Sequence, residues 1–495
     1  MADARDEEIA DLRRQLAERD AVIEQLRARV AALQAEVLAL KEALGKSSRN
    51  SSKPPSSDGP ATAPRPKRPP SGRKPGGQPG HTRRARPLEP SEKARSIIAC
   101  LPIRCEKCHR GLHGRDPNPR RHQVFDLPKL EPFFEEYQLH ALGCSCGHVT
   151  CGRLPAGVPT GSFGPGVVAA VALLIGVFRL SKRMVPALMA DLFNLHMSVG
   201  AVVGCQRQAS EALAASVEEA KAYVVEQPVK HADETGWREG VHRSRAWLWA
   251  VVTTSVVVFM VHARRNADAA HALLVCAAGV LVSDRHGAYN WWPDRLRQFC
   301  WAHLKRDVQA IVERGGLSEA VGRGLLDEID RMFHWWHRVG YGTLSRRSFQ
   351  VYMRPLRKRF EAGLRLGTLS DHPKTAKTCA NLLKHADALW TFVRVEGVEP
   401  TNNAAEQVVR HGVILRKITY GTHSEAGSRF IERILTTHAT LRRQERNMLA
   451  FLREACVARL NNRQPPSLLP TQAFRLHAAN AAGCRSIITV MFTVT

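Results

Sequence analysis

Between residues 228 and 310, short apolar runs alternate with polar loops, and two of these runs end at an aspartate. The run "VKHAD" predicts a short strand that ends at Asp233, and "GVLVSD" predicts a buried strand that ends at Asp284. The stretches "RAWLWAVVTT" and "VVVFMVHA" predict a strand hairpin, and "NADAAHALLV" predicts a helix. "RQFCWAHLKRD" begins as a strand and continues as a helix. We therefore predict an α/β domain over residues 226–440.

The predicted order is strand, strand, strand, helix, strand, with an aspartate on the first and the fourth strand, and this is the order of a ribonuclease H-like fold. In that fold the first and fourth strands are neighbours, so we expect Asp233 and Asp284 at one edge of the sheet. Two adjacent carboxylates repel each other unless a cation compensates them. Mg²⁺ is the natural cation, since it prefers a few carboxylates with phosphate oxygens and water. The alternative is that Asp233 and its neighbour Glu234 are ordinary strand-end residues.

The charge of the chain points to a polyanionic partner. Its 495 residues include 72 Lys and Arg against 46 Asp and Glu, a formal net charge of +26, which favours nucleic acid over a membrane. Residues 46–92 are rich in Ser, Pro and Gly, and between Lys46 and Arg86 they carry eleven basic residues and one acid. We predict a disordered basic arm that contacts DNA phosphates, with a solvated linker as the alternative. Its candidate DNA contacts are Arg73, Lys74, Arg83 and Arg84.

A third carboxylate is expected from the later helix "TNNAAEQVVRHGVILRK", residues 401–417. Thr401 or Asn402 can cap this helix, and Glu406 then lies in its first turns. A carboxylate flanked by cations suits a metal site that grips a phosphate backbone. The basic residues of the helix, which are candidate DNA contacts, are Arg410, Arg416 and Lys417.

Residues 1–45 carry a heptad pattern without Gly or Pro before Gly45. Mostly β-branched residues at position a with Leu at position d favour a parallel two-stranded coiled coil, and hence a homodimer or higher oligomer. Arg19 interrupts the d positions, and the alternative is a helix packed on its own domain. The apolar a positions are Ile9, Leu16, Ile23, Val30, Val37 and Leu44, and the d positions are Leu12, Leu26, Leu33 and Leu40.

Six of the twelve cysteines fall between Cys100 and Cys151, within a predicted domain of residues 93–155. The motifs "CEKC" and "CSCGHVTC", joined by a segment that alternates like short strands, predict a zinc ribbon with one structural Zn²⁺. The alternative is a set of reduced cysteines without metal. The expected ligands are Cys105, Cys108, Cys144 and Cys146, with His148 or Cys151 as alternatives to the last.

Residues 160–225 predict helices, arranged either as a helix-turn-helix or as a plain helical hairpin. The apolar run at 166–178 is too short to span a bilayer of about 30 Å and is expected to be a buried helix. The N-terminus has a charged helical pattern and no secretory signal, so we expect a cytoplasmic, nucleoid-associated protein. The motif "CWAHLKRD" suggests Cys300 and His303 as metal ligands, but packing and hydrogen bonding beside the sheet is the favoured interpretation.

Several motifs in one order carry a resemblance to a known family. "GRKPGGQPGH", the cysteine pairs, "HADETGW", "SDRHGAYN", "CWAHLKRD" and "TNNAAEQVVR" resemble the transposases of the bacterial Insertion Sequence 66 family, from residue 1 to about residue 470. The resemblance implies a DD(E)-type DNA transposase whose catalytic acids are Asp233, Asp284 and Glu406, with two Mg²⁺ or Mn²⁺ ions in the active site. Residues 308–395 resemble a helical insertion into the catalytic domain.

The resemblance also bears on partners and on alternative functions. The expected partners are double-stranded DNA, at element ends and at the target, with helper proteins from the same element as further candidates. Residues 441–495 are expected to form a helical tail, whose end "HAANAAGCRSIITVMFTVT" departs from the family. One alternative function is an inactive DNA-binding, architectural or regulatory protein. The other is a nuclease of the same fold that performs no strand transfer.

Overall fold

The computed structural model describes residues 2–47, 51–53 and 86–470. Four candidate DNA contacts in the basic arm, and the atypical end of the chain, lie outside the described residues. The four contacts are Arg73, Lys74, Arg83 and Arg84. The chain divides into a unit of residues 62–133 and a larger unit of residues 1–61 and 134–495.

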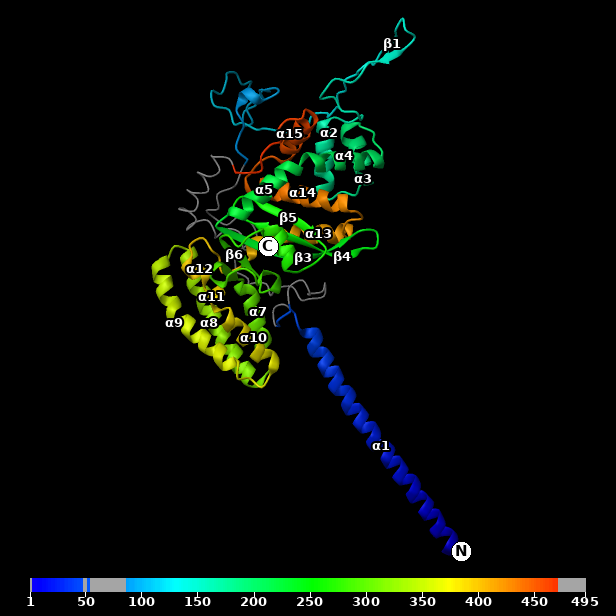
Figure 1. The fold of residues 1–495 in the computed structure, drawn as a ribbon, viewed down its shortest axis with the longest axis vertical. Helices are drawn as coiled ribbons and strands as arrows, with labels where there is room; N and C mark the ends of the chain where they lie inside the picture. The colour runs from blue at the N-terminus through cyan, green and yellow to red at the C-terminus, as the bar shows by residue number, and fades with distance from the viewer. Residues whose placement is uncertain (1, 48–50, 54–85, 471–495) are drawn as a thin grey trace. The chain divides into compact units, whose positions relative to one another are not determined.

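The heptad segment is one continuous helix, α1 (Ala2–Gly45) (Figure 1). Between Leu16 and Leu40 its apolar heptad side chains are about half exposed: Leu26 is 56% exposed, Val30 52% and Leu33 53%. A long helix with a hydrophobic seam open to solvent is unfavourable alone, because that surface is stabilised only when it is removed from water. No part of the described chain covers this seam.

A five-stranded mixed sheet forms the centre of the larger unit, with the strand order β5-β4-β3-β6-β7. β3 pairs antiparallel with β4 and parallel with β6, so the first and fourth strands of the domain are neighbours as expected. The strands are β3 (Val229–Glu239), β4 (Ser244–Val252), β5 (Val257–His262), β6 (Val280–Ser283) and β7 (Arg297–Phe299). The multidomain α/β prediction is confirmed.

The prediction that the first strand ends at Asp233 is wrong. β3 continues for six residues to Glu239, because the antiparallel hairpin with β4 supplies hydrogen-bond partners from His231 to Glu239. The parallel pairing with β6 is shorter, and its last register pair is His231 with Val282. Asp233 therefore lies inside a strand but beyond the point where β6 stops.

One face of the sheet carries α13 (Asn403–Thr419), and the edge strand β5 is covered by α14 (Glu425–Arg443) (Figure 1). Side chains of α14 accept hydrogen bonds from alternate backbone N–H groups of β5. Four residues of helix advance about 6.0 Å and two residues of strand about 6.6 Å, so the two spacings match. The pairs are Thr440 with Val257, Thr436 with Phe259, and Glu432 with Val261. The helix thereby closes an edge that would otherwise expose unpaired donors.

Two helical groups complete the larger unit. Helices from residues 165–226 and α15 pack in the same hydrophobic core as most of the sheet. The helices within residues 301–394 form a second core with Val282 and Phe299. The first group is α2 (Pro165–Gly176), α3 (Met184–Phe193), α4 (Val199–Ala212), α5 (Ala214–Glu226) and α15 (Met448–Leu460). The second is α7 (Trp301–Val312), α8 (Gly316–Gly340), α9 (Arg346–Gly367), α10 (Pro373–Lys384), α11 (Ala386–Leu389) and α12 (Thr391–Arg394). The other helices of the larger unit are α6 (Ala267–Leu274) and the 3-10 helices η3 (Gly287–Tyr289) and η4 (Asp294–Leu296), while η2 (Ser91–Lys93) belongs to the unit of residues 62–133.

The apolar run at 166–178 forms α2, which buries Val168 and Val171 as expected. Within the described part of the chain, no helix combines the length and the apolar character that crossing a membrane requires.

The cysteine-rich segment contains less regular structure than the sequence predicts. The only strands within residues 86–160 are the short hairpin β1 (Ala141–Gly143) and β2 (Val149–Cys151). The alternating segment at 120–140 forms no strand, and two of its apolar side chains, Leu127 and Phe133, are more than four-fifths exposed. Alternation predicts a strand only when a second layer covers the apolar face, and this segment has no such layer.

Candidate active site

The register of the sheet brings the two predicted aspartates level with each other. Two residues beyond the last pair, His231 with Val282, lie Asp233 on β3 and Asp284 directly after β6. The Asp284 carboxylate is held by its own loop, because its Oδ1 accepts the backbone N–H of His286 at 2.9 Å. The expectation that these aspartates share one edge of the parallel strand pair agrees with this register.

α13 brings the third predicted acid to the same place. The helix lies close on the sheet at Gly412, where a Cβ atom would come within 2.2 Å of the Leu248 side chain. Near its end, Arg416 donates hydrogen bonds to the Gly236 carbonyl and the Thr235 hydroxyl of β3. Glu406, in the first turn of α13, is then near enough for its charge to act on Asp233.

Asn402 fastens the start of α13 in a way that the sequence did not predict. Its side chain makes no capping hydrogen bond, contrary to the expected role, and is instead completely buried against β3. Its amide donates to the Ala232 carbonyl at 2.8 Å, and its oxygen lies 3.2 Å from Nδ1 of His231. Burial lowers the pKa of His231 to about 4, so this ring is neutral and structural.

Burial and the neighbouring acids both affect the pKa of Asp233. Burial raises the pKa of Asp233 well above its ordinary value, and the charges of Glu234, Asp284 and Glu406 raise it further. An ionised Asp233 is therefore unfavourable here without a compensating cation. Asp233, Asp284 and Glu406 are an oxygen donor set of the kind that hard divalent cations prefer.

Glu234 is not an ordinary strand-end residue, because its side chain is fully buried on the opposite face of β3 from Asp233. Its carboxylate accepts from Arg265 Nε at 2.7 Å and from the Tyr289 hydroxyl at 2.5 Å. The other end of the same guanidinium lies 3.4 Å from Asp284. Arg265 thus compensates one carboxylate fully and touches a second. Tyr289 lies in the motif "SDRHGAYN", but neither it nor Arg265 was predicted as a site residue, since both reach Glu234 from separate elements.

The basic residues of α13 that are predicted to contact DNA differ in how exposed they are. Arg410 and Lys417 are exposed, while Arg416 is occupied by the hydrogen bonds to β3. His286 accepts the backbone N–H of Ala288 and caps η3. It is therefore a structural residue of the loop that holds Asp284.

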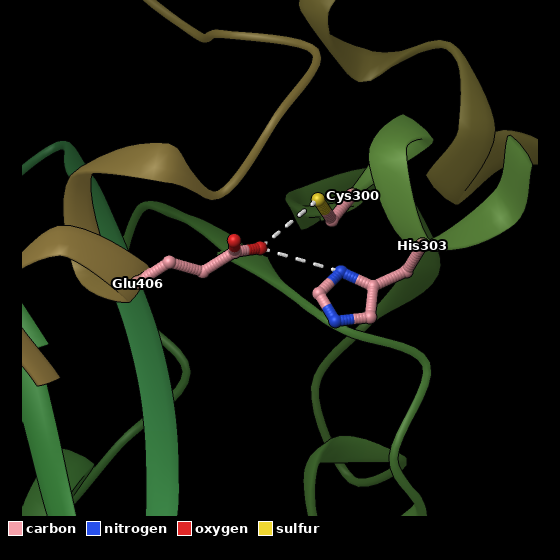
Figure 2. Close-up of side chains that lie close together, drawn as sticks. All are labelled: Cys300, His303 and Glu406. Atoms are coloured by element: carbon pink, nitrogen blue, oxygen red, sulfur yellow. Dashed lines mark hydrogen bonds and ion pairs between the residues drawn. The ribbon is translucent and has the colours of Figure 1, made fainter. Parts of the chain in front are cut away.

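The motif "CWAHLKRD" meets Glu406 directly. Cys300 and His303, at the start of α7, both point to the Glu406 carboxylate (Figure 2). The Cys300 Sγ lies 3.8 Å and the His303 Nδ1 lies 3.4 Å from Glu406 Oε1. The ligand atoms of all three residues lie within 4.8 Å of one another.

The predicted zinc ligands form two separate tight turns. Backbone N–H groups of Cys108 and Lys107 lower the pKa of the Cys105 thiol, and those of Cys146 do the same for Cys144. A thiol that accepts backbone donors is predisposed to the thiolate form that binds metal. Cys105 and Cys108 belong to the unit of residues 62–133, whereas Cys144 and Cys146 belong to the larger unit.

Two protein-family models match parts of the chain. A family model described as the transposase IS66 family matches residues 160–430, and one described as a family of unknown function (DUF6444) matches residues 6–87. No curated protein matches the chain closely enough to count as a relative.

The raised pKa of Asp233 makes a prediction about stability. An acid whose pKa is raised by folding stabilises the fold when protonated, and this stabilisation is lost as the pH rises through the raised pKa. Without added divalent metal, Asp233→Asn should therefore raise the melting temperature at about pH 8, by about 1–2 °C for each kcal/mol gained in a unit of this size. The advantage should shrink as the pH falls through the raised pKa of Asp233, because the wild-type side chain then becomes protonated itself.

Thermal melts of both proteins across this pH range measure the effect. Asp327→Asn, at an exposed position on α8, is the matched control and should change little. Equal melting temperatures for Asp233→Asn and the wild type at about pH 8 would contradict the inferred repulsion.

Proposed function

The chain belongs to the IS66 family of transposases, and we propose that it cuts DNA at element ends and joins them to a target through a DDE mechanism. Asp233, Asp284 and Glu406 are the catalytic acids in this proposal. The observation that carries it is the β3–β6 register, which makes Asp233 and Asp284 neighbours, together with the placement of Glu406 by α13. The strand order supports a ribonuclease H-like catalytic domain with α8–α12 as its helical insertion.

The charge balance of the site fits two divalent cations. Of the four carboxylates that act on one another, Glu234 is compensated by Arg265, which leaves three negative charges. Two Mg²⁺ or Mn²⁺ ions would supply four positive charges, so one remains to attract the scissile phosphate. This balance also explains why the carboxylates are tolerated so close together.

In this proposal each residue of the site has a role that follows from its position. When bound, the two metal ions would activate water or a DNA 3′-hydroxyl and stabilise the leaving oxygen. Asp233 on β3 and Asp284 directly after the neighbouring strand β6 would hold the metal ions. Glu406 would close the site from the helix side, and Arg265 would hold Asp284 in place. The reaction needs no covalent enzyme intermediate, so no nucleophilic side chain is required.

DNA binding is implied by family membership, and the basic residues supply it in this proposal. Arg410 lies one turn after Glu406, and Lys417 lies near the other end of the helix, both exposed. The basic arm would add phosphate contacts that carry little sequence information. The two regions would therefore hold the duplex backbone near the catalytic acids.

Removing any catalytic acid tests the mechanism. Asp233→Asn, Asp284→Asn and Glu406→Gln should each lower cleavage and joining by at least about a thousandfold, because the acids act as a unit. DNA binding should remain close to wild type, since the change affects metal binding more than phosphate contacts. Cleavage and strand transfer on labelled element ends, with Mg²⁺ and with EDTA, measure the effect.

Asp327→Asn on α8 is the matched control for loss of a carboxylate outside the site. Wild-type cleavage by Asp233→Asn in Mg²⁺ would rule out the assigned acids. Pre-nicked ends that are never joined to a second duplex would rule out strand transfer and leave a nuclease.

We further propose that Cys105, Cys108, Cys144 and Cys146 bind one structural Zn²⁺. The two cysteine turns have the tight backbone geometry and lowered thiol pKa that thiolate ligands require. A closed four-ligand site would give order to a segment that has very little hydrophobic burial of its own.

Metal analysis of the purified protein should find about one tightly held zinc per chain. Cys105→Ser or Cys108→Ser should lose this zinc and weaken recognition of element ends. Cys100→Ser, at an exposed cysteine outside both turns, is the control and should keep the metal. Zinc-free protein from a preparation without chelator would reject the ribbon.

We also propose that α1 forms a parallel coiled coil with a second copy, which would pair two active sites for two element ends. The half-exposed seam on α1 supports this, since a partner helix would bury it.

Val30→Asp should weaken self-association of the full chain by at least about tenfold, or 1.4 kcal/mol, because it puts a charge into the buried seam. Val22→Asp makes the same change at position g of the heptad, where charge is accepted, and should have little effect. Size-exclusion chromatography with light scattering measures both. A wild-type chain that stays monomeric at high micromolar concentration would contradict the proposal.

A further inference from the structure

We propose that Cys300, His303 and Glu406 form a second metal site, specific for a zinc-like transition metal ion, which competes with the catalytic cations for Glu406. The site is distinct from the cysteine turns and shares one ligand with the catalytic acids. The metal-binding part stands on its own geometry, and the competition rests on the proposed function.

The distances between the ligand atoms fit a tetrahedral zinc ion. Zn–S bonds of about 2.3 Å and Zn–N and Zn–O bonds of about 2.0–2.2 Å place sulfur and oxygen about 3.5 Å apart, and nitrogen and oxygen about 3.4 Å apart. The observed separations from Glu406 Oε1 are 3.8 Å to Cys300 Sγ and 3.4 Å to His303 Nδ1. These two separations would need to change by only a few tenths of an ångström to accommodate an ion, and the sulfur and nitrogen lie within 4.8 Å of each other.

The surroundings of the nitrogen and sulfur atoms also bear on metal binding. Nδ1 of His303 is buried and makes no hydrogen bond, although the ring is partly exposed. A buried nitrogen that makes no hydrogen bond is costly, and metal coordination would satisfy it. Cys300 is 1% exposed, and burial raises the pKa of its thiol to about 11, although its sulfur accepts the backbone N–H of Asn402 at 3.2 Å, which acts in the opposite direction. The bound cation itself would therefore have to stabilise the thiolate ligand.

The donor types decide which metal the site takes. Thiolate and imidazole select zinc and its chemical relatives over Mg²⁺, which prefers oxygen. Three protein ligands leave a fourth position for water or a substrate oxygen, as in open zinc sites. The three residues come from two elements, with Cys300 and His303 at the start of α7 and Glu406 on α13 (Figure 2).

Sharing Glu406 has a functional consequence. A zinc ion held by Cys300 and His303 would draw the Glu406 carboxylate away from Asp233 and Asp284. The catalytic site would then lack its third acid, so Zn²⁺ would inhibit a reaction that Mg²⁺ supports. The site would thereby make DNA cleavage sensitive to the availability of transition metal.

Cobalt substitution in the full chain tests the binding site without any assay of activity. Protein whose ribbon already holds zinc should take up one further equivalent of Co²⁺ and show a cobalt–thiolate charge-transfer band. Cys300→Ser and His303→Gln should each weaken this uptake by at least about tenfold and remove or shift the band. Cys379→Ser, at another buried cysteine, is the matched control and should keep both.

Cys300→Ser also separates the proposal from a simple hydrogen-bonded cluster. Serine keeps a hydroxyl that can donate to Glu406 but removes the soft ligand. A wild-type protein that shows no band, or a band that survives in both Cys300→Ser and His303→Gln, would overturn the site. Melting temperatures close to wild type would show that the variants are folded.

Inhibition tests the competition separately. Zn²⁺ should inhibit Mg²⁺-dependent nicking by the wild type, and the concentration for half inhibition should rise at least about tenfold in Cys300→Ser, each compared with its own rate without zinc. Cobalt binding by a protein that shows no Mg²⁺-dependent nicking would support the metal site but reject the proposed function. Nicking that zinc inhibits equally in the wild type and in Cys300→Ser would reject the competition.

Discussion

The parallel pairing of β3 with β6 is the contact on which the candidate site depends. It lasts for three residue pairs and ends at His231 with Val282, so Asp233 and Asp284 emerge at the same level. A shift of the register by one residue would turn one of the two carboxylates to the other face of the sheet. The antiparallel pairing on the other side of β3 continues past Asp233, so the backbone there stays in the strand and fixes the direction of the Asp233 side chain.

This arrangement brings carboxylates close enough to repel one another, and neighbouring residues reduce that repulsion. The strand alternation places Glu234 on the opposite face from Asp233, where Arg265 and Tyr289 bind its carboxylate. Arg265 also reaches Asp284, so one guanidinium reduces the repulsion between two acids. The remaining repulsion raises the pKa of Asp233 and favours a cation at the site.

The helices around the sheet hold the third acid in place. Asn402 ties the start of α13 to Ala232, one residue before Asp233, and Arg416 ties its end to the same strand. α14 closes the β5 edge through side chains whose spacing matches the strand. Glu406 therefore projects from a helix fixed at both ends, which suits a ligand that has to be placed precisely.

Local patterns in the sequence determined the strands that bear Asp233 and Asp284, the helix that bears Glu406, and the long apolar seam of α1. These features depend on periodicities within one element, which a sequence displays directly. Tertiary structure alone decided the continuation of β3 to Glu239, since the partner strand supplies its hydrogen bonds. It also decided which donors meet: Cys300 and Glu406 are separated by 106 positions and approach only because α7 and α13 converge beside one sheet. Such contacts follow from the packing of whole elements, and no spacing within either motif encodes them.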